Sequence, residues 1–221
     1  LESYYLQEYI PLLKDNQTGV PFFKKEFSYD QFCNNNINKQ LIEYIDSLIK
    51  YPTGKIPVLK FNRTAFRAQW FKQFYHQALN LYLIRSPRDQ WQSYIELHKR
   101  TAYHDFFLMD LLAANANYNH PDFAPLSKIV PLFPFNNSNP EKEFLFYKHL
   151  LPNYSEEERY FIFYYIWFDA LLKNIINSDF IVDINLLTQD KSYREKTENL
   201  FHERGYMGVN FQDAKIEIPF P

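Results

Sequence analysis

Two side chains between residues 81 and 94 have the chemistry and spacing to bind an anion together. Arg85 follows the apolar run 79–84, which we predict to be a strand, and Ser93 lies eight residues later in the helix that should begin near Ser86. Ligands of open α/β sheets gather at the carboxyl ends of strands, and helix N-termini attract anions. A guanidinium and a hydroxyl meeting there would hold a phosphate or sulfate. The alternative is an ordinary strand-to-helix turn with solvated arginines.

Three other cations precede this segment. Lys60 stands near the end of the short apolar run 56–61, a second predicted strand, and Arg63 and Arg67 follow one helical turn apart. The two arginines could face the same anion or could simply be a surface pair. Asn62 lies among them, and because an amide cannot abstract a proton at neutral pH, this position supplies no general base.

The histidines and the single cysteine lack the spacing of known metal or nucleophile motifs. We therefore expect neither a metal site nor a thiol nucleophile at Cys33, and one cysteine excludes an internal disulfide. His98 and His104 follow the predicted Ser93 helix and could supply a missing base. Asp169 lies in an apolar stretch, where we expect a buried, hydrogen-bonded role. The six histidines are His76, His98, His104, His120, His149 and His202.

The elements that would position these residues alternate between strand and helix. The hydrophobic spacing predicts strands at 56–61, 79–84 and 180–184. Strand, helix, strand and helix within residues 56–100 indicate a βαβ unit with a parallel sheet. Ser155 and Glu158 predict a capping box at the start of a central core helix. The predicted helices are 3–14, 37–50, 65–75, one beginning at 87, 102–117, 142–151, 155–177 and 193–204.

Composition narrows the class of protein. The 221 residues suit a single domain, and 24 Lys and Arg against 26 Asp and Glu give a net charge of -2, which excludes nucleic-acid binding by bulk positive charge. No stretch approaches the roughly 20 apolar residues of a membrane-spanning helix, and no signal peptide is recognisable. From these features and the lone cysteine we expect a cytoplasmic protein. The oligomeric state cannot be predicted.

The sequence around Arg85 resembles the sulfotransferase superfamily. Residues 85–94, RSPRDQWQSY, are similar to its 3′-phosphate-binding motif, in which an arginine at a strand end is followed eight residues later by a serine on the next helix. Residues 57–63, 81–89, 158–167 and 182–187 are similar to bacterial sulfotransferase-like proteins in the same order. The likeness extends from about Leu6 to Pro221, and it implies a single domain over 1–221 with a P-loop-like parallel sheet and a large helical portion.

The resemblance implies roles for several residues. Arg85 and Ser93 would bind the 3′-phosphate of the co-substrate 3′-phosphoadenosine 5′-phosphosulfate, with Arg67 as a further candidate and no metal. Lys60 corresponds to a lysine that lies two residues before a catalytic histidine, and with Arg63 it would act on the sulfuryl end. This sequence has Asn62 where that histidine is expected, so the general base is unknown.

A second departure concerns the loop that holds the 5′-phosphosulfate in this family. Nothing before Lys60 supplies its Lys/Arg-x-Gly-Ser/Thr pattern between a strand and a helix, and only four glycines occur. We expect this first strand, loop and helix to lie upstream of Leu1 or to have been lost, and this segment alone to be inactive. Two hypotheses follow: a sulfotransferase acting on an unknown hydroxyl or amine, or a non-catalytic nucleotide-binding or protein-interaction module. A kinase-like P-loop fragment is a weaker analogy.

Overall fold

The computed structural model describes residues 22–24, 27, 33, 36–50, 56–61, 65–101, 105–134, 140–212 and 214. This part of the chain is mostly helical and contains one two-stranded parallel sheet, so it is an α/β structure with a large helical portion, as predicted. Strand β1 (Leu81–Ile84) pairs with β2 (Phe180–Asp183) in the register Leu81 with Phe180 through Ile84 with Asp183. The helix predicted over 3–14 lies outside the described residues.

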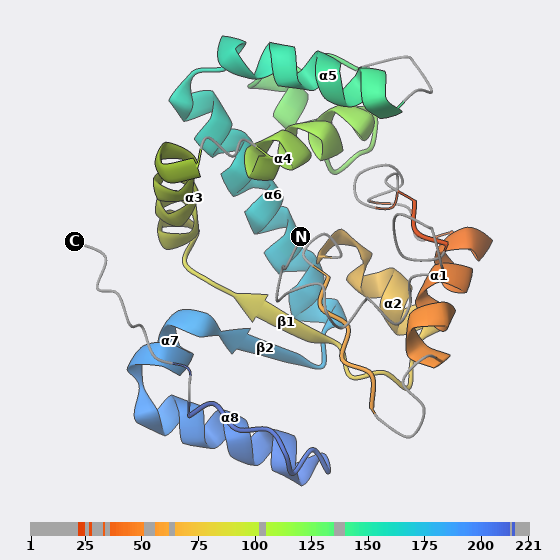
Figure 1. Ribbon diagram of the computed structural model, residues 1–221, viewed down its shortest axis with the longest axis vertical. Coiled ribbons are helices and arrows are strands. Elements are labelled where there is room, and N and C mark those ends of the chain that lie inside the picture. The colour runs from red at the N-terminus through yellow and green to blue at the C-terminus, as the bar shows by residue number, and fades with distance from the viewer. Residues whose placement is uncertain are drawn as a thin grey trace.

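The helices surround the sheet unequally, with most of them on the side of β1 (Figure 1). Those predicted from the hydrophobic spacing are confirmed, with end residues shifted by a few positions. The helical elements of the described residues are α1 (Lys39–Lys50), η3 (Ala65–Arg67), α2 (Ala68–Phe74), α3 (Pro87–Thr101), α4 (Asp105–Ala116), η4 (Leu126–Lys128), α5 (Pro140–Leu150), η5 (Leu151–Asn153), α6 (Glu156–Asn177), α7 (Ile184–Gln189) and α8 (Lys191–Glu203). Of these, η4, η5 and α7 were not predicted.

Two of the three predicted strands are confirmed, and the first is wrong. Residues 56–61 have no regular structure, and the side chains of Ile56 and Val58 are 72% and 89% exposed. A run of β-formers becomes a strand only where a partner strand and a packing surface are present, and Pro57 has no N–H to donate to a ladder. The predicted pairing of 56–61 with β1 is therefore replaced by pairing with β2, far along the chain.

Helix α6 runs through the middle of the molecule, with α3, α4 and α2 around it (Figure 1). Its predicted capping box is confirmed: Glu158 N donates to Ser155 Oγ at 3.2 Å, and Ser155 N donates to Glu158 Oε2 at 2.8 Å. One face of α6 is buried in the core, but the opposite face leaves large apolar side chains exposed. These are Tyr164, Phe168, Leu172, Ile175 and Ile176.

The core divides into three clusters. The largest lies between α4 and α6 and includes Phe107, Leu111 and Phe123, all fully buried. A second cluster joins α1 to α2 around the fully buried Trp70. The third packs α7 and α8 on β2 through Val182, among others. β1 thus lies between the helical body around α6 and the smaller β2–α7–α8 unit (Figure 1).

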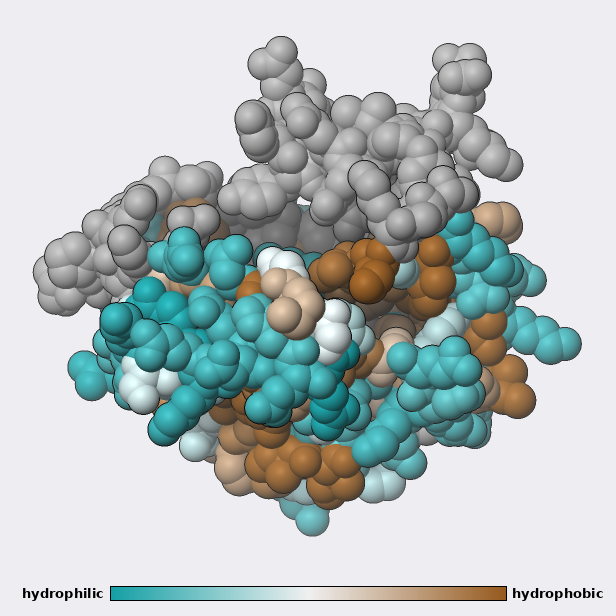
Figure 2. Space-filling view, turned by 90° about the horizontal axis from the view of Figure 1, so that it is seen from below, coloured by the Kyte–Doolittle hydropathy of each residue, from teal (hydrophilic) through white to brown (hydrophobic). Residues whose placement is uncertain are grey.

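The lower end of the molecule presents a mainly hydrophilic surface. Figure 2 views this end directly: hydrophilic residues cover the centre, and hydrophobic side chains gather in separate patches beside and below it. Exposed apolar residues of the elements at this end include Ile181 and Leu186. Among the helices of the described ranges, none combines the length and apolar character needed to cross a membrane.

Candidate functional site

The two strands end side by side, so the helices that follow them begin at the same edge of the sheet. Ile84 and Asp183 are register partners, α3 begins at Pro87 and α7 at Ile184 (Figure 1). Asp183 caps α7, because its Oδ1 accepts the backbone N–H groups of Asn185 at 2.8 Å and Leu186 at 3.1 Å. We call this edge of the sheet, with the residues that follow both strands, the strand-edge site.

Asn185 connects the two helix starts. Its Oδ1 accepts the backbone N–H of Ser86 at 3.1 Å, and its Nδ2 donates to Asp89 Oδ2 at 2.6 Å. Ser86 Oγ in turn accepts the backbone N–H of Asp89 at 3.4 Å, the bond expected of a helix N-cap. Since one amide side chain at the start of α7 bonds two residues at the start of α3, it holds the two helix starts together.

The expected order of strand, arginine, helix start and serine is present at this site. Arg85 is half-buried directly after β1, and its carbonyl accepts the indole N–H of Trp167 at 3.2 Å. Ser93 lies about 9 Å along the α3 axis from Pro87. Its Oγ is shielded from solvent and has no hydrogen-bond partner within the described part of the chain. Buried hydroxyls are normally bonded, so Ser93 Oγ is an exception that a ligand oxygen would satisfy.

The other predicted site residues have different surroundings. Lys60 is exposed on the irregular segment 56–61, so it does not end a strand as predicted. Arg67 is only 3% exposed and donates from Nη1 to the carbonyl of Phe27, so it is an interior residue and not a surface arginine. Arg63 and Asn62 lie outside the described residues.

The two histidines considered as bases cannot be placed relative to the strand-edge site. His104 lies outside the described residues, and so does the side chain of His98, although its backbone belongs to α3. Asp169, predicted to be buried and hydrogen-bonded, is mostly buried and paired with Lys173 on the same helix. It belongs to a second polar cluster, on the face of α6 that meets the turn after α4.

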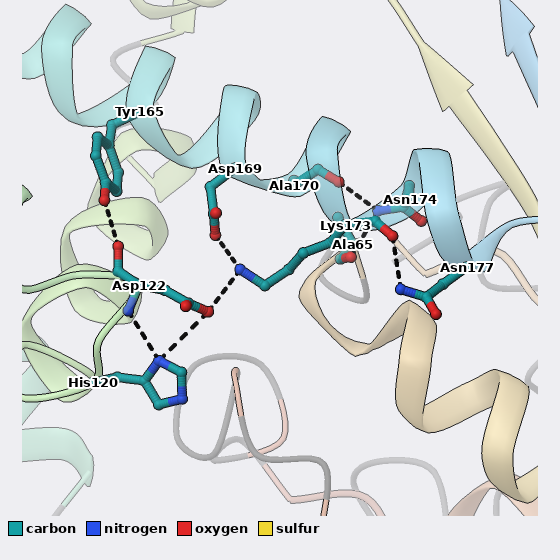
Figure 3. A network of polar contacts seen from close by, with 9 residues as sticks. All are labelled: Ala65, His120, Asp122, Tyr165, Asp169, Ala170, Lys173, Asn174 and Asn177. Atoms are coloured by element: carbon teal, nitrogen blue, oxygen red, sulfur yellow. Dashed lines mark hydrogen bonds and ion pairs between the residues drawn. The ribbon is translucent and has the colours of Figure 1, made fainter.

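That cluster is centred on the ammonium of Lys173 (Figure 3). Its Nζ lies 2.6 Å from Asp122 Oδ2 and also contacts Asp169 Oδ2, and all three side chains are about three-quarters buried. Tyr165, one turn before Asp169 on α6, donates its hydroxyl to the backbone carbonyl of Asp122. Burial disfavours the lysine charge, but the two carboxylates outweigh it and raise the pKa of Lys173 above its usual value. We call these residues, with His120 and Cys33, the Lys173 cluster.

His120 and Cys33 complete the Lys173 cluster. His120 Nδ1 lies 3.4 Å from Asp122 Oδ2 and accepts the backbone N–H of Asp122 at 3.3 Å (Figure 3). Cys33 is buried, and its sulfur, a ring nitrogen of His120 and a carboxylate oxygen of Asp122 all lie within 4.8 Å of one another. Burial raises the pKa of the Cys33 thiol to about 12, so at neutral pH it is protonated and a poor nucleophile.

The sequence did not reveal this cluster, because its members come from distant segments. Cys33, His120 and Lys173 have no motif spacing, so the absence of a metal site was expected from the sequence. The only local signal was the separation of Asp169 and Lys173 by four residues, which predicts an ion pair on one helix face.

Comparisons with known proteins do not assign this chain to a family. Scans of family models, of curated proteins and of solved structures found no match. A functional assignment therefore depends on the chemistry of the strand-edge site and on the sequence around it.

Proposed function

We propose that this chain is a sulfotransferase-like domain that binds 3′-phosphoadenosine 5′-phosphosulfate and transfers its sulfuryl group to an acceptor hydroxyl or amine. The observation that carries the proposal is the unsatisfied hydroxyl of Ser93, which follows Arg85 along the strand–helix connection from β1 to α3. The family motif uses an arginine and a serine in this order. A 3′-phosphate oxygen would supply the acceptor that Ser93 Oγ lacks among the described residues.

Arg85 and Ser93 are donors of the kind that a phosphate dianion requires. Arg85 offers a guanidinium that can donate two parallel hydrogen bonds, and Ser93 offers a hydroxyl. The first turn of α3 adds the partial positive charge of a helix N-terminus. Ser86 Oγ already accepts the Asp89 amide of that turn, so the phosphate would depend mainly on the two side chains.

The proposed reaction is an in-line displacement at sulfur. The acceptor oxygen or nitrogen attacks the sulfur, the bond from sulfur to the phosphate oxygen breaks, and adenosine 3′,5′-bisphosphate leaves. The acceptor proton passes to a base that is not identified in this chain. Lys60, which is exposed, and Arg63 would neutralise charge at the sulfuryl end.

A second candidate is a non-catalytic module that binds the nucleotide. Two observations favour it: Asn62 stands where the family has a catalytic histidine, and segment 56–61 is not the strand that would hold Lys60 rigidly. The asparagine at position 62 and the irregular segment 56–61 bear only on sulfuryl transfer and not on binding of the 3′-phosphate. Binding of the 3′-phosphate at Arg85 and Ser93 is common to the two candidates.

Calorimetric titration with adenosine 3′,5′-bisphosphate tests the binding site. We expect Arg85→Ala and Ser93→Ala each to weaken binding at least tenfold, about 1.4 kcal/mol. Arg88→Ala is the matched control, because Arg88 is an exposed arginine on the first turn of α3 and should change affinity less than threefold. Absence of binding by the unaltered chain, or an equal loss in all three variants, would overturn the proposal.

Turnover tests the transfer step. The chain is incubated with 3′-phosphoadenosine 5′-phosphosulfate and water or a simple phenol as acceptor, and release of the bisphosphate is followed by chromatography. Release that exceeds the uncatalysed rate and falls in Arg85→Ala supports the enzyme. Tight binding without release shows that this segment binds the nucleotide but does not catalyse transfer by itself.

A further inference from the structure

The Lys173 cluster brings three different metal-binding groups together from two separate segments. Cys33 comes from the amino-terminal part of the chain, and His120 and Asp122 from the turn after α4. A sulfur, an imidazole nitrogen and a carboxylate oxygen lie within 4.8 Å of one another. This is the combination of donors that zinc accepts and that magnesium and calcium do not, since those ions prefer oxygen alone.

We propose that Cys33, His120 and Asp122 bind a zinc ion as its three protein ligands. Bonds of about 2.0–2.3 Å in a tetrahedral site place ligand atoms roughly 3.3–3.8 Å apart. A contraction of at most about 1.5 Å would therefore bring the three atoms, which lie within 4.8 Å of one another, into range. The fourth position would be left to water or a small anion, as in zinc sites that act on substrates.

Two carboxylates favour a cation at this site. Asp122 and Asp169 both contact Lys173, and Asp122 is itself a proposed ligand. Zinc binding releases the thiol proton to solvent, because the thiolate is the form that binds the metal.

Neighbouring residues already hold Asp122 in place. Lys173 Nζ contacts Asp122 Oδ2, and Tyr165 donates to the Asp122 carbonyl. Such contacts to ligating residues orient metal ligands and tune their affinity. His120 and Asp122 are partly exposed, at 37% and 28% of their side chains, so an ion can enter from solvent although Cys33 is buried.

Zinc chloride added to the chelator-treated full chain tests the site. We expect binding by calorimetry and a higher unfolding temperature, because a ligand that binds only the folded state stabilises it. Cys33→Ser and His120→Gln should each lower the affinity at least tenfold. His76→Gln is the control, since His76 is exposed on the turn after α2. Absence of binding by the unaltered chain, or equal affinity in all variants, would overturn the proposal.

Cobalt provides a readout that does not depend on stability. Co²⁺ bound through a thiolate has an intense near-ultraviolet charge-transfer band, and Cys33 is the single cysteine of the chain, so the band can have only one source. We expect it in the unaltered protein and in His76→Gln, and we expect Cys33→Ser to lose it. A cobalt complex of the unaltered protein without this band would overturn the assignment of Cys33 as a ligand.

Discussion

The indole nitrogen of Trp167 donates a hydrogen bond to the backbone carbonyl of Arg85 across 3.2 Å. This bond links the central helix α6 to the residue that follows β1, over a sequence separation of 82 residues. Because Trp167 holds the main chain at Arg85, it fixes the backbone position from which the Arg85 side chain extends. The orientation of the proposed phosphate-binding arginine therefore depends on a helix that itself supplies no proposed phosphate ligand.

Trp167→Phe should remove this hydrogen bond while keeping most of the ring packing. We expect a loss of about 1 kcal/mol in the free energy of unfolding, measured by urea denaturation. If the proposed function is correct, adenosine 3′,5′-bisphosphate should also bind more weakly. Phe168→Leu is the control, because Phe168 is the exposed neighbour and should change stability by less than about 0.5 kcal/mol. Equal stability of Trp167→Phe and the unaltered chain would contradict the role of this bond.

Asn185→Asp should disrupt the connection between the starts of α3 and α7. The substitution keeps an acceptor for the Ser86 amide but replaces the Nδ2 donor with a carboxylate oxygen next to Asp89 Oδ2. Repulsion and the lost donor should lower the free energy of unfolding by about 1–3 kcal/mol.

The double variant Asn185→Asp with Asp89→Asn exchanges the two side chains and restores one donor opposite one acceptor. We expect it to recover most of the lost stability in the same urea experiment. If the loss in free energy of unfolding of the double variant equals the sum of the losses of the two single variants, the two side chains do not interact.

Lys173→Met should destabilise the fold, because it leaves Asp122 and Asp169 facing each other without their shared cation. We expect a loss of about 1–3 kcal/mol in the free energy of unfolding at neutral pH. Lys191→Met is the matched control: Lys191 pairs with Glu195 on the exposed surface of α8, where an ion pair contributes about 1 kcal/mol or less. Equal losses of stability in the two variants would show that the buried ion pairs of Lys173 with Asp122 and Asp169 stabilise the fold no more than an exposed pair does.

Cys33 should make stability fall at alkaline pH. Its pKa is raised to about 12 in the folded state by burial, whereas an unfolded thiol titrates near 8.5. The unfolded state therefore loses its proton first, so stability is fully present below about pH 8.5 and decreases as pH rises toward 12. Between pH 8 and 10 the unaltered chain should lose about 1–2 kcal/mol more than Cys33→Ala.

Urea denaturation of both proteins at pH 8, 9 and 10, with a chelator present, measures this difference. The tyrosines, including Tyr154 with its pKa raised to about 12 by burial, are common to both proteins and cancel in the comparison. Parallel pH profiles would contradict the burial of a neutral thiol.

Local signals in the sequence were sufficient for most helices. The capping box of Ser155 and Glu158 was predicted and is present, because its partners are three residues apart and need no other element. Helix α7 was not predicted, and residue 184 was assigned to the strand before it. Asp183 ends that strand by accepting the backbone N–H groups of Asn185 and Leu186, which a count of apolar residues does not detect.

Pairing and assembly were decided by the tertiary structure. The sequence alone determined where β1 and β2 lie and that Arg85 and Ser93 follow β1, because strand propensity and helix starts are encoded in neighbouring residues. It could not determine that β1 pairs with β2 and not with 56–61, or that Cys33 meets His120, since both contacts join distant segments. Cys33 lies in the same buried core as Phe123, next to the turn that carries His120, so burial of apolar side chains from distant segments decides this contact. The pairing of β1 with β2 is decided by backbone hydrogen bonds between segments about 100 residues apart.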